Sequence, residues 1–380
     1  MEKLVLIDGH AILHRAYHAY PPLTNSKGEL VGAVYGFTSI LLTVLKKLHP
    51  KYAAVAFDKK APTFRHKKYK DYKAHRKPMD EDLIKQILPV HEVVEVLSIP
   101  IFEVDGYEAD DVIGTLASQA VEGVRISHFK SNARPKQGKT LSEKTDLARR
   151  KFARNLDKKN KGDRSKFSTH FEMDIAYPLK TLGAQSLEIL IVTGDQDAMQ
   201  LVDGNVKVYM PARGRQPEKI YDEKEVLKKY GLKPVQIVDF KALAGDASDG
   251  IPGVTGIGPK TAVKLLNEYN TLESIYTSLD ELPNKVAQKL ERDEKQALLS
   301  QELARIDKNS PVRLDLRSCR LTDYDRGKVI KLFEELEFKS LINKLPENEW
   351  MEMAEEVVGG MEKKTKPKKS KGEGRQMGLF

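Results

Sequence analysis

Three carboxylates within four residues mark a candidate chemical site. Glu108, Asp110 and Asp111 stand just before the apolar stretch that begins at Val112, where a helix is predicted. Residues three apart share a helix face, so Glu108 and Asp111 should lie together, with Asp110 about 100° away. One acid at a helix start is explained by the helix dipole, worth about 0.3–1 kcal/mol. Three repel one another and need solvent, basic side chains or divalent metal as an offset.

More acids stand at the ends of predicted strands or the starts of predicted helices. Together with the first three they are Asp8, Asp58, Glu108, Asp110, Asp111, Asp195, Asp197, Asp246 and Asp249. Oxygen ligands without His or Cys favour Mg²⁺ or Mn²⁺ over zinc. Two such ions, about 3.5–4 Å apart, support in-line hydrolysis of a phosphodiester. For any single acid, a structural role such as helix capping is the alternative.

The elements that must position these acids alternate between strand and helix. Strands are predicted at residues 4–7, 53–57, 101–104 and 187–192, and helices at 12–20, 32–48, 82–97 and from about 108. This alternation predicts a doubly wound, mostly parallel α/β sheet, in which ligands bind outside the carboxyl ends of the strands. Asp8, Asp58 and Asp195 follow such strands, so the acids should converge on one edge.

A basic insertion interrupts this pattern at residues 125–186. Its first part, 125–180, holds 16 Lys or Arg against 6 Asp or Glu, whereas the whole chain carries +9. Helix-to-strand connections normally have about 2–6 residues, and they enter the strand at its amino end, opposite the acids. A disordered or partly helical excursion is preferred over a DNA-binding element. Residues 124–127 are an alternative to 187–192 as the strand.

Helices predominate after a predicted hairpin at 211–217. A glycine-rich stretch follows Asp249 and opens a helix with Pro259 in its first turn. It is not a Walker phosphate loop, because Pro259 intrudes and no buried strand precedes it. Glycines and a helix N-terminus instead suit a sequence-independent contact with the backbone of duplex DNA. The residues predicted to make this contact are Gly253, Gly256, Gly258, Lys260 and Thr261.

Residues 64–77 mix Lys, Arg and His with Phe and Tyr, as segments that bind single strands do. A solvated basic helix face has the same composition and is preferred for this segment taken alone. The uneven positive charge of the chain suggests a polyanionic partner.

Cysteine content and hydropathy exclude several classes for this 380-residue chain, which is long enough for two domains. The one cysteine, Cys319, excludes an intrachain disulfide framework and a cysteine-rich zinc site. No apolar run approaches the roughly 18 residues of a membrane span, and the N-terminus has no signal-peptide shape. We expect a soluble, cytoplasmic monomer.

Six motifs in combination carry a family resemblance. They are Leu-Ile-Asp8-Gly-His, Ala-Phe-Asp58 with the following Ala-Pro-Thr-Phe-Arg-His, Gly-Tyr-Glu108-Ala-Asp110-Asp111, Thr-Gly-Asp195-Gln-Asp197, Gly-Asp246-Ala-Ser-Asp249 and Gly-Val-Thr-Gly-Ile-Gly-Pro-Lys-Thr-Ala. Over residues 1–123 and 187–345 the chain resembles the bacterial 5′-3′ exonuclease, or flap endonuclease, domain of DNA polymerase I and its stand-alone homologues.

The resemblance implies a PIN-like nuclease domain at 1–210 and a helical DNA-binding domain at 211–345. It places a helix-three-turn-helix, with K⁺, at 250–266 and a pair of Mg²⁺ or Mn²⁺ ions at the acids. It also implies an arch for the 5′ single strand. The implied contacts with DNA come from Arg65, Tyr72, Lys73 and Arg76, of which Lys73 and Arg76 face the scissile phosphate.

The implied activity is structure-specific removal of 5′ flaps and 5′ ends, as in Okazaki-fragment processing and repair. A non-catalytic branched-DNA binding module and a PIN-type ribonuclease are the alternatives. Gly250 stands where the family usually has Asn. No polymerase domain follows, so coupling to synthesis is expected to come from a partner.

The last 35 residues, 346–380, are predicted to form a flexible Lys-rich tail. Its end resembles the peptide that binds the bacterial β sliding clamp. The residues concerned are Gln376, Met377, Leu379 and Phe380. An apolar pair that ends a charged tail has no core to join, so a pocket on a partner explains it better than folding does, and a chance match is the alternative. The clamp is the expected partner and would place the protein at the nucleoid.

Overall fold

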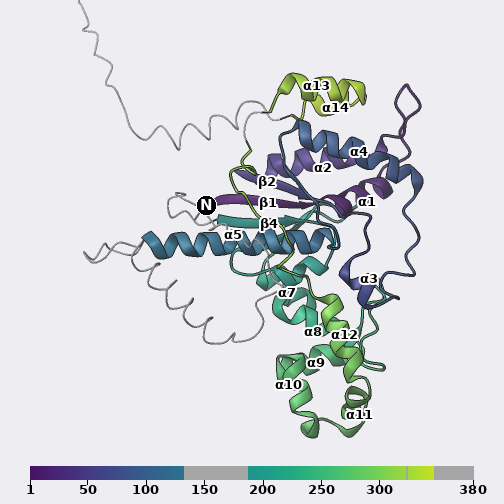
Figure 1. Ribbon diagram of the computed structural model, residues 1–380, viewed down its shortest axis with the longest axis vertical. Helices are drawn as coiled ribbons and strands as arrows, with labels where there is room; N and C mark the ends of the chain where they lie inside the picture. Colours follow the sequence, from purple (N-terminus) through teal and green to yellow (C-terminus); the bar gives the residue numbers. More distant parts are fainter. Residues whose placement is uncertain (132–186, 322–323, 346–380) are drawn as a thin grey trace, which may run out of the picture.

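The computed structural model describes residues 1–131, 187–321 and 324–345. Most of the basic insertion and the expected clamp-binding peptide lie outside the described residues. Within them, helices cover both faces of a six-stranded sheet, and a second group of helices lies below it (Figure 1). Among the described helices, none is both long and apolar enough to cross a membrane.

The sheet has the strand order β3-β2-β1-β4-β5-β6. The parallel strands are β1 (Glu2–Asp8), β2 (Tyr52–Ala56), β3 (Ile101–Phe102), β4 (Leu187–Val192) and β5 (Val206–Met210). The short strand β6 (Lys219–Tyr221) pairs antiparallel with β5. The central strand β1 is apolar on both sides because both of its faces are covered. The predicted mostly parallel α/β sheet is confirmed.

Each face of the sheet has its own core. Val5 and Ile7 point into the first, and Leu4 and Leu6 point into the second. The helices that contribute to the first core are α1 (Gly9–Ala19), α2 (Gly32–Leu48), α4 (Glu81–Val96), α13 (Arg326–Glu335) and α14 (Lys339–Ile342). The second core is covered by α5 (Ala109–Ser131) (Figure 1).

The lower group of helices has a separate apolar core that includes Leu243, Ala262 and Leu266. Its members are α8 (Ile237–Ala244), α9 (Pro259–Tyr269), α10 (Leu272–Thr277), α11 (Asn284–Arg292) and α12 (Glu294–Ala304). The helix α7 (Glu223–Tyr230) lies between this group and the sheet (Figure 1).

The packing differs from the domain limits expected at residues 210 and 345. Strand β6 still belongs to the sheet, and Ile306 and Cys319 lie in its second core. Val329 and Phe333 of α13 lie in its first core. The chain therefore returns from the lower helices to the sheet, because these apolar side chains find their partners there.

Helix α5 also differs from its expected extent. It runs to Ser131, so residues 124–127 are helical, and the strand is formed by Leu187–Val192. The helical part therefore continues past residue 125, where the insertion was expected to begin.

Candidate metal centre and nucleic-acid interface

The acids lie at the carboxyl ends of the parallel strands, as predicted. Asp8 ends β1, and Asp195 follows β4. The Asp8 carboxylate is held by the backbone N–H of Ala11, at 2.9 Å, and by the hydroxyl of Thr193, at 2.8 Å. It caps α1 and at the same time faces the other acids, so the capping and metal-binding interpretations are compatible.

Asp8, Asp110 and Asp195 form the first acid group. Burial raises the pKa of Asp8 to about 7, and the charges of Asp58 and Asp195 add to this effect. Burial also raises the pKa of Asp110 well above its usual value, and the charges of Asp8 and Asp195 raise it further. Within the described part of the chain, no hydrogen bond reaches the Asp110 carboxylate. A cation would relieve this repulsion.

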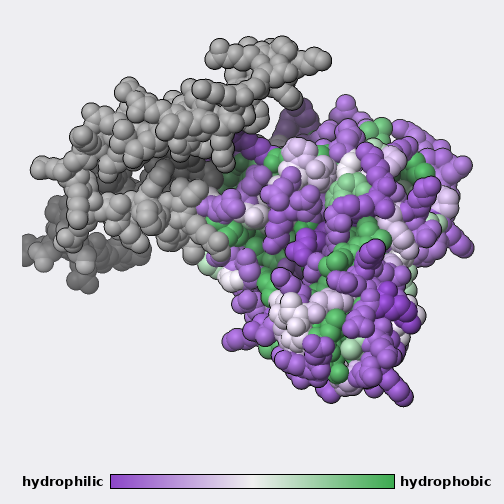
Figure 2. Space-filling view, turned by 60° about the horizontal axis from the view of Figure 1, so that its bottom comes forward, coloured by the Kyte–Doolittle hydropathy of each residue, from purple (hydrophilic) through white to green (hydrophobic). Residues whose placement is uncertain are grey.

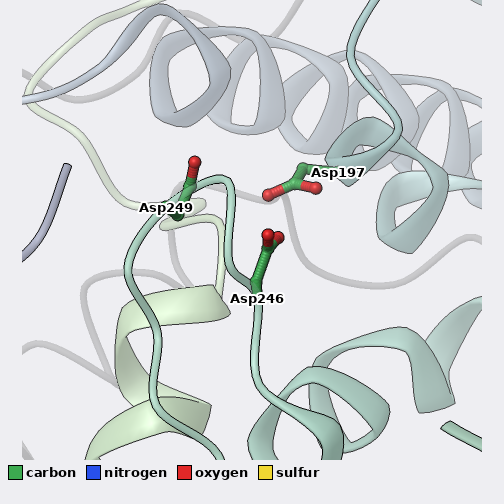
Figure 3. Close-up of side chains that lie close together, drawn as sticks. All are labelled: Asp197, Asp246 and Asp249. Atoms are coloured by element: carbon green, nitrogen blue, oxygen red, sulfur yellow. The ribbon is translucent and has the colours of Figure 1, made fainter. Parts of the chain in front are cut away.

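Asp197, Asp246 and Asp249 form the second acid group (Figure 3). Among the described residues, they are the one set of three acids whose ligand oxygens all lie within 4.8 Å of one another. Asp197 starts the 3₁₀ helix η1 (Asp197–Leu201), and the other two come from the loop after α8. The group therefore joins the sheet to the lower helices, and its hard oxygen donors suit a divalent ion.

Lys241 was missed in the sequence analysis. Its ammonium group donates to Asp246 at 2.5 Å and also to Asp197. Burial raises the pKa of Asp197 to about 6 despite this lysine. Burial also opposes ionisation of Asp246, but Lys241 and Ser248 outweigh it and bring its pKa to about 2. A lysine within the apolar helix α8, five residues before Asp246, was the available signal.

Two cations of the basic segment, residues 64–77, lie beside Glu108 and the second acid group. The Lys73 ammonium lies 2.9 Å from Glu108 Oε2 and 4.0 Å from Asp249 Oδ2. Arg76 Nη2 donates to Asp249 Oδ1 at 2.6 Å. The structure thus places both expected cations beside the acids.

Tyr72 lies elsewhere than expected. Its ring is buried, and its hydroxyl donates to Glu108 Oε2 at 3.1 Å, so it is not placed to stack on a base. Burial and the charge of Glu108 raise the pKa of this phenol.

Arg65 and Asp111 also differ from the expectation. Their side chains are buried and form two hydrogen bonds of 2.7 Å with each other. The Arg65 side chain is therefore not exposed for a contact with DNA, and the Asp111 carboxylate is occupied by Arg65. Glu108 and Asp111 do share a face of the first turn of α5, because both contact Arg65.

Asp58 lies at the rim, with its side chain 43% exposed. One of its oxygens accepts the Ala109 N–H at 2.6 Å and so holds the start of α5. A cleft of about 780 Å³ opens here, lined by Asp8, Asp110, Asp195, Lys73 and Arg76 among others. The side chains on the face of the molecule seen in Figure 2 are mostly hydrophilic.

The glycine-rich stretch, residues 253–258, follows Asp246 and Asp249 in the loop that connects α8 to α9. Gly256, Gly258 and Lys260 are exposed there, and Pro259 starts α9. Gly253 has a different role, because it is buried and a Cβ on it would lie 2.2 Å from the nitrogen of Gly245. It closes the loop against the end of α8 and does not face a ligand.

Two family models match the chain. Residues 3–129 match the N-terminal resolvase-like domain of 5′-3′ exonucleases, and residues 232–327 match their C-terminal SAM fold. DNA polymerase I of Caldicellulosiruptor bescii is 37% identical over 345 residues, which are 90% of this chain and 33% of that protein. DNA polymerase I of Bacillus subtilis is 33% identical over 348 residues, 91% of this chain and 32% of that protein.

The chain spans about a third of the length of these curated relatives. The 5′-exonuclease of bacteriophage T5 with bound zinc has a similar fold, with a TM-score of 0.55 and 17% identity. That alignment covers 80% of this chain and 90% of the phage protein. A flap endonuclease of the same phage, in a complex with DNA and metal ions, gives a TM-score of 0.54 at 17% identity, over 81% of this chain and 89% of the phage protein. Together with the acids of the site, these matches establish that the chain belongs to the 5′-3′ exonuclease family.

Proposed function

We propose that the protein is a metal-dependent 5′-3′ exonuclease and 5′-flap endonuclease that hydrolyses phosphodiester bonds of DNA. The observation that carries the proposal is that Lys73 pairs with Glu108, beside the first acid group, and that Lys73 and Arg76 both pair with Asp249 of the second. Carboxylates alone would repel a phosphate, whereas cations beside metal-binding carboxylates suit a phosphodiester.

The proposed metal ligands divide between the two groups. Asp8, Asp110 and Asp195, with Glu108 beside them, would hold one ion, and Asp197, Asp246 and Asp249 the other. Asp58 would hold the start of α5, which carries Asp110, beside these ligands. Two bound Mg²⁺ or Mn²⁺ ions supply a hydroxide at neutral pH and neutralise charge on the leaving oxygen. The fit rests on the all-oxygen donor set and on the raised pKa values of Asp8 and Asp197.

Lys73 and Arg76 would hold the scissile phosphate. Both are already fixed by Glu108 and Asp249, so they need little reorganisation when charge develops on the phosphate. The exposed end of the glycine-rich loop, with Lys260 and Thr261, would hold the duplex backbone as a helix-three-turn-helix. We propose a K⁺ ion at the same loop.

A 5′-labelled flap duplex tests the function directly. The protein with Mg²⁺ should release the flap near its junction, and the Asp195→Asn variant should not. Tight binding of the flap without cleavage would instead indicate a branched-DNA binding module. Cleavage of single-stranded RNA in preference to the flap would indicate a PIN-type ribonuclease.

The sliding clamp is a second proposal, for residues outside the described part of the chain. Gln376, Met377, Leu379 and Phe380 would bind an apolar pocket of the β clamp and so raise the local concentration of nuclease at replication junctions. Measuring clamp affinity with and without residues 376–380 tests it. Equal affinities would contradict the proposal.

A further inference from the structure

Arg65 is anchored on every side. Its guanidinium donates to Asp111 twice, at 2.7 Å, and to two backbone oxygens, those of Leu303 at 2.9 Å and Arg305 at 2.7 Å. It also forms an ion pair of 3.5 Å with Glu108 Oε2. A planar fork of this kind is rigid, and it leaves none of the three guanidinium nitrogens free for DNA.

Both carboxylate oxygens of Asp111 also accept hydrogen bonds. Besides the two bonds from Arg65, Oδ1 accepts the backbone N–H of Asp307 at 2.8 Å, and Oδ2 accepts that of Glu108 at 3.1 Å. The side chain is 0% exposed. A carboxylate with four donors around it, and no solvent access, is held as a structural anion and is not open to a metal ion.

Three parts of the proposed active site meet at this pair. Arg65 lies in α3 (Phe64–Lys68), at the start of the segment that carries Lys73. Asp111 lies in the first turn of α5, beside Asp110. The oxygens of Leu303 and Arg305 belong to the end of α12, which packs on α8, and α8 leads into the second acid group. The pair is therefore placed to fix the distance between the two groups.

We propose that Arg65 and Asp111 are a positioning pair that sets the geometry of the two-ion centre without binding metal or DNA. The proposal rests on the proposed function. Breaking a buried pair by changing one partner leaves an uncompensated charge, so each single change should disturb the same geometry. Changes in residues that orient metal ligands typically cost about 10–100-fold in metal affinity or activity.

The test compares Arg65→Gln, Asp111→Asn and the double variant. Each single change should lower the single-turnover rate about 10–100-fold and raise the half-saturating Mn²⁺ concentration, while the number of bound ions stays the same. The single-turnover rate of the double variant should be no lower than that of the slower single variant, because the two residues act as one unit. Arg65→Lys should not restore activity, since a lysine lacks the planar fork.

Glu302→Gln is the matched control. Glu302 on α12 pairs with Lys68 on α3, so it links the same two helices, but both side chains are about half exposed. Surface pairs contribute about 0–1 kcal/mol, and this variant should keep the Mn²⁺ dependence of the wild type. A variant with Arg65→Met and Asp111→Leu removes both charges of the pair and covers the case in which the single variants do not fold. It should show the same raised half-saturating Mn²⁺ concentration, and a wild-type Mn²⁺ dependence would contradict the proposal.

Two results would overturn the pairing. One is loss of a bound Mn²⁺ ion, measured by calorimetry, in Asp111→Asn alone. The other is additive losses of rate in the double variant. Calorimetry does not require turnover, so it still tests the pair if wild-type protein cuts no flap, in which case the proposed function fails on its own.

Discussion

Lys73 reaches Glu108 and Asp249 from a left-handed backbone conformation, with φ of 54°. The backbone N–H of Lys73 donates to the backbone carbonyl oxygen of Asp249 at 2.9 Å, which holds this conformation in place. A non-glycine residue in this region is strained, and such strain is found at functional sites. The backbone therefore directs the ammonium group into the cleft before any substrate is bound.

Replacing Lys73 or Arg76 with methionine should lower the single-turnover rate of flap cleavage about 100–1,000-fold, because preorganised cations act on charge that develops in the transition state. Affinity for the flap duplex should change far less. Rates and dissociation constants, measured for the same variants, check this. The exposed Lys77, changed to Met, is the control from the same segment. Equal losses of rate and affinity would mean that these cations only bind the ground state.

The raised pKa values of Asp8, about 7, and Asp197, about 6, make the stability of the folded protein depend on pH. The folded protein keeps protons that the unfolded chain releases near its ordinary pKa of 3.8. The stability that these two groups contribute is therefore lost progressively as the pH rises from about 3.8 to about 6 for Asp197 and to about 7 for Asp8. Above that range we expect bound metal ions to take the place of the protons.

Mg²⁺ should therefore raise the melting temperature more at about pH 8 than at about pH 5, since protons compete with the metal at the lower pH. Thermal unfolding with MgCl₂, and with NaCl at equal ionic strength, measures the effect. A metal-induced shift that is the same at both pH values would contradict the assignment of these carboxylates.

Among the elements, the basic segment docks on the loop that carries the second acid group. Gly250 has a φ of 71°, and a Cβ on it would lie 2.7 Å from the Asp71 oxygen. The absence of a side chain at Gly250 thus lets the two segments approach closely.

Gly250→Ala should lower flap cleavage by displacing the segment that holds Lys73. Gly214→Ala is the control, because Gly214 also has a positive φ, of 56°, but a Cβ on it would meet no described residue beyond its chain neighbours within 4 Å. Both variants incur the left-handed penalty of about 1 kcal/mol, and only the first also has the clash. Melting temperatures and cleavage rates separate the two costs. Equal cleavage by the two variants would show that the close approach is unimportant.

The elements that could be predicted from the sequence are those set by local pattern. The helix Gly32–Leu48 was predicted with its observed limits, and the acids were expected at the strand ends where they lie. The contacts of Arg65 with Asp111 and of Lys241 with Asp197 could not be predicted, because these partners are 46 and 44 residues away in the chain. The family resemblance implied a contact with DNA for Tyr72, but only tertiary packing determines that its ring is buried.

On the scale of the whole molecule, the chain returns to the sheet after the lower helices. Residues 326–342 form α13 and α14, which pack with α2 and α4 in the first core (Figure 1). Val329 and Phe333 are 0% exposed. The family model for the C-terminal fold ends at residue 327, before both side chains. Stability of the nuclease core therefore depends on residues beyond that match.

A chain truncated after Asp325 should consequently unfold at a lower urea concentration than one truncated after Leu345. Full burial of a Val or Phe side chain contributes about 1.5–3 kcal/mol, and α14 adds Leu341 to the same core. The longer chain keeps all of these contacts and should match the full-length protein. Urea unfolding followed by far-UV circular dichroism compares the three midpoints. If the two truncated chains had the same urea midpoint, α13 and α14 would not contribute to the stability of the sheet. The stable fold would then be complete at the end of the family match.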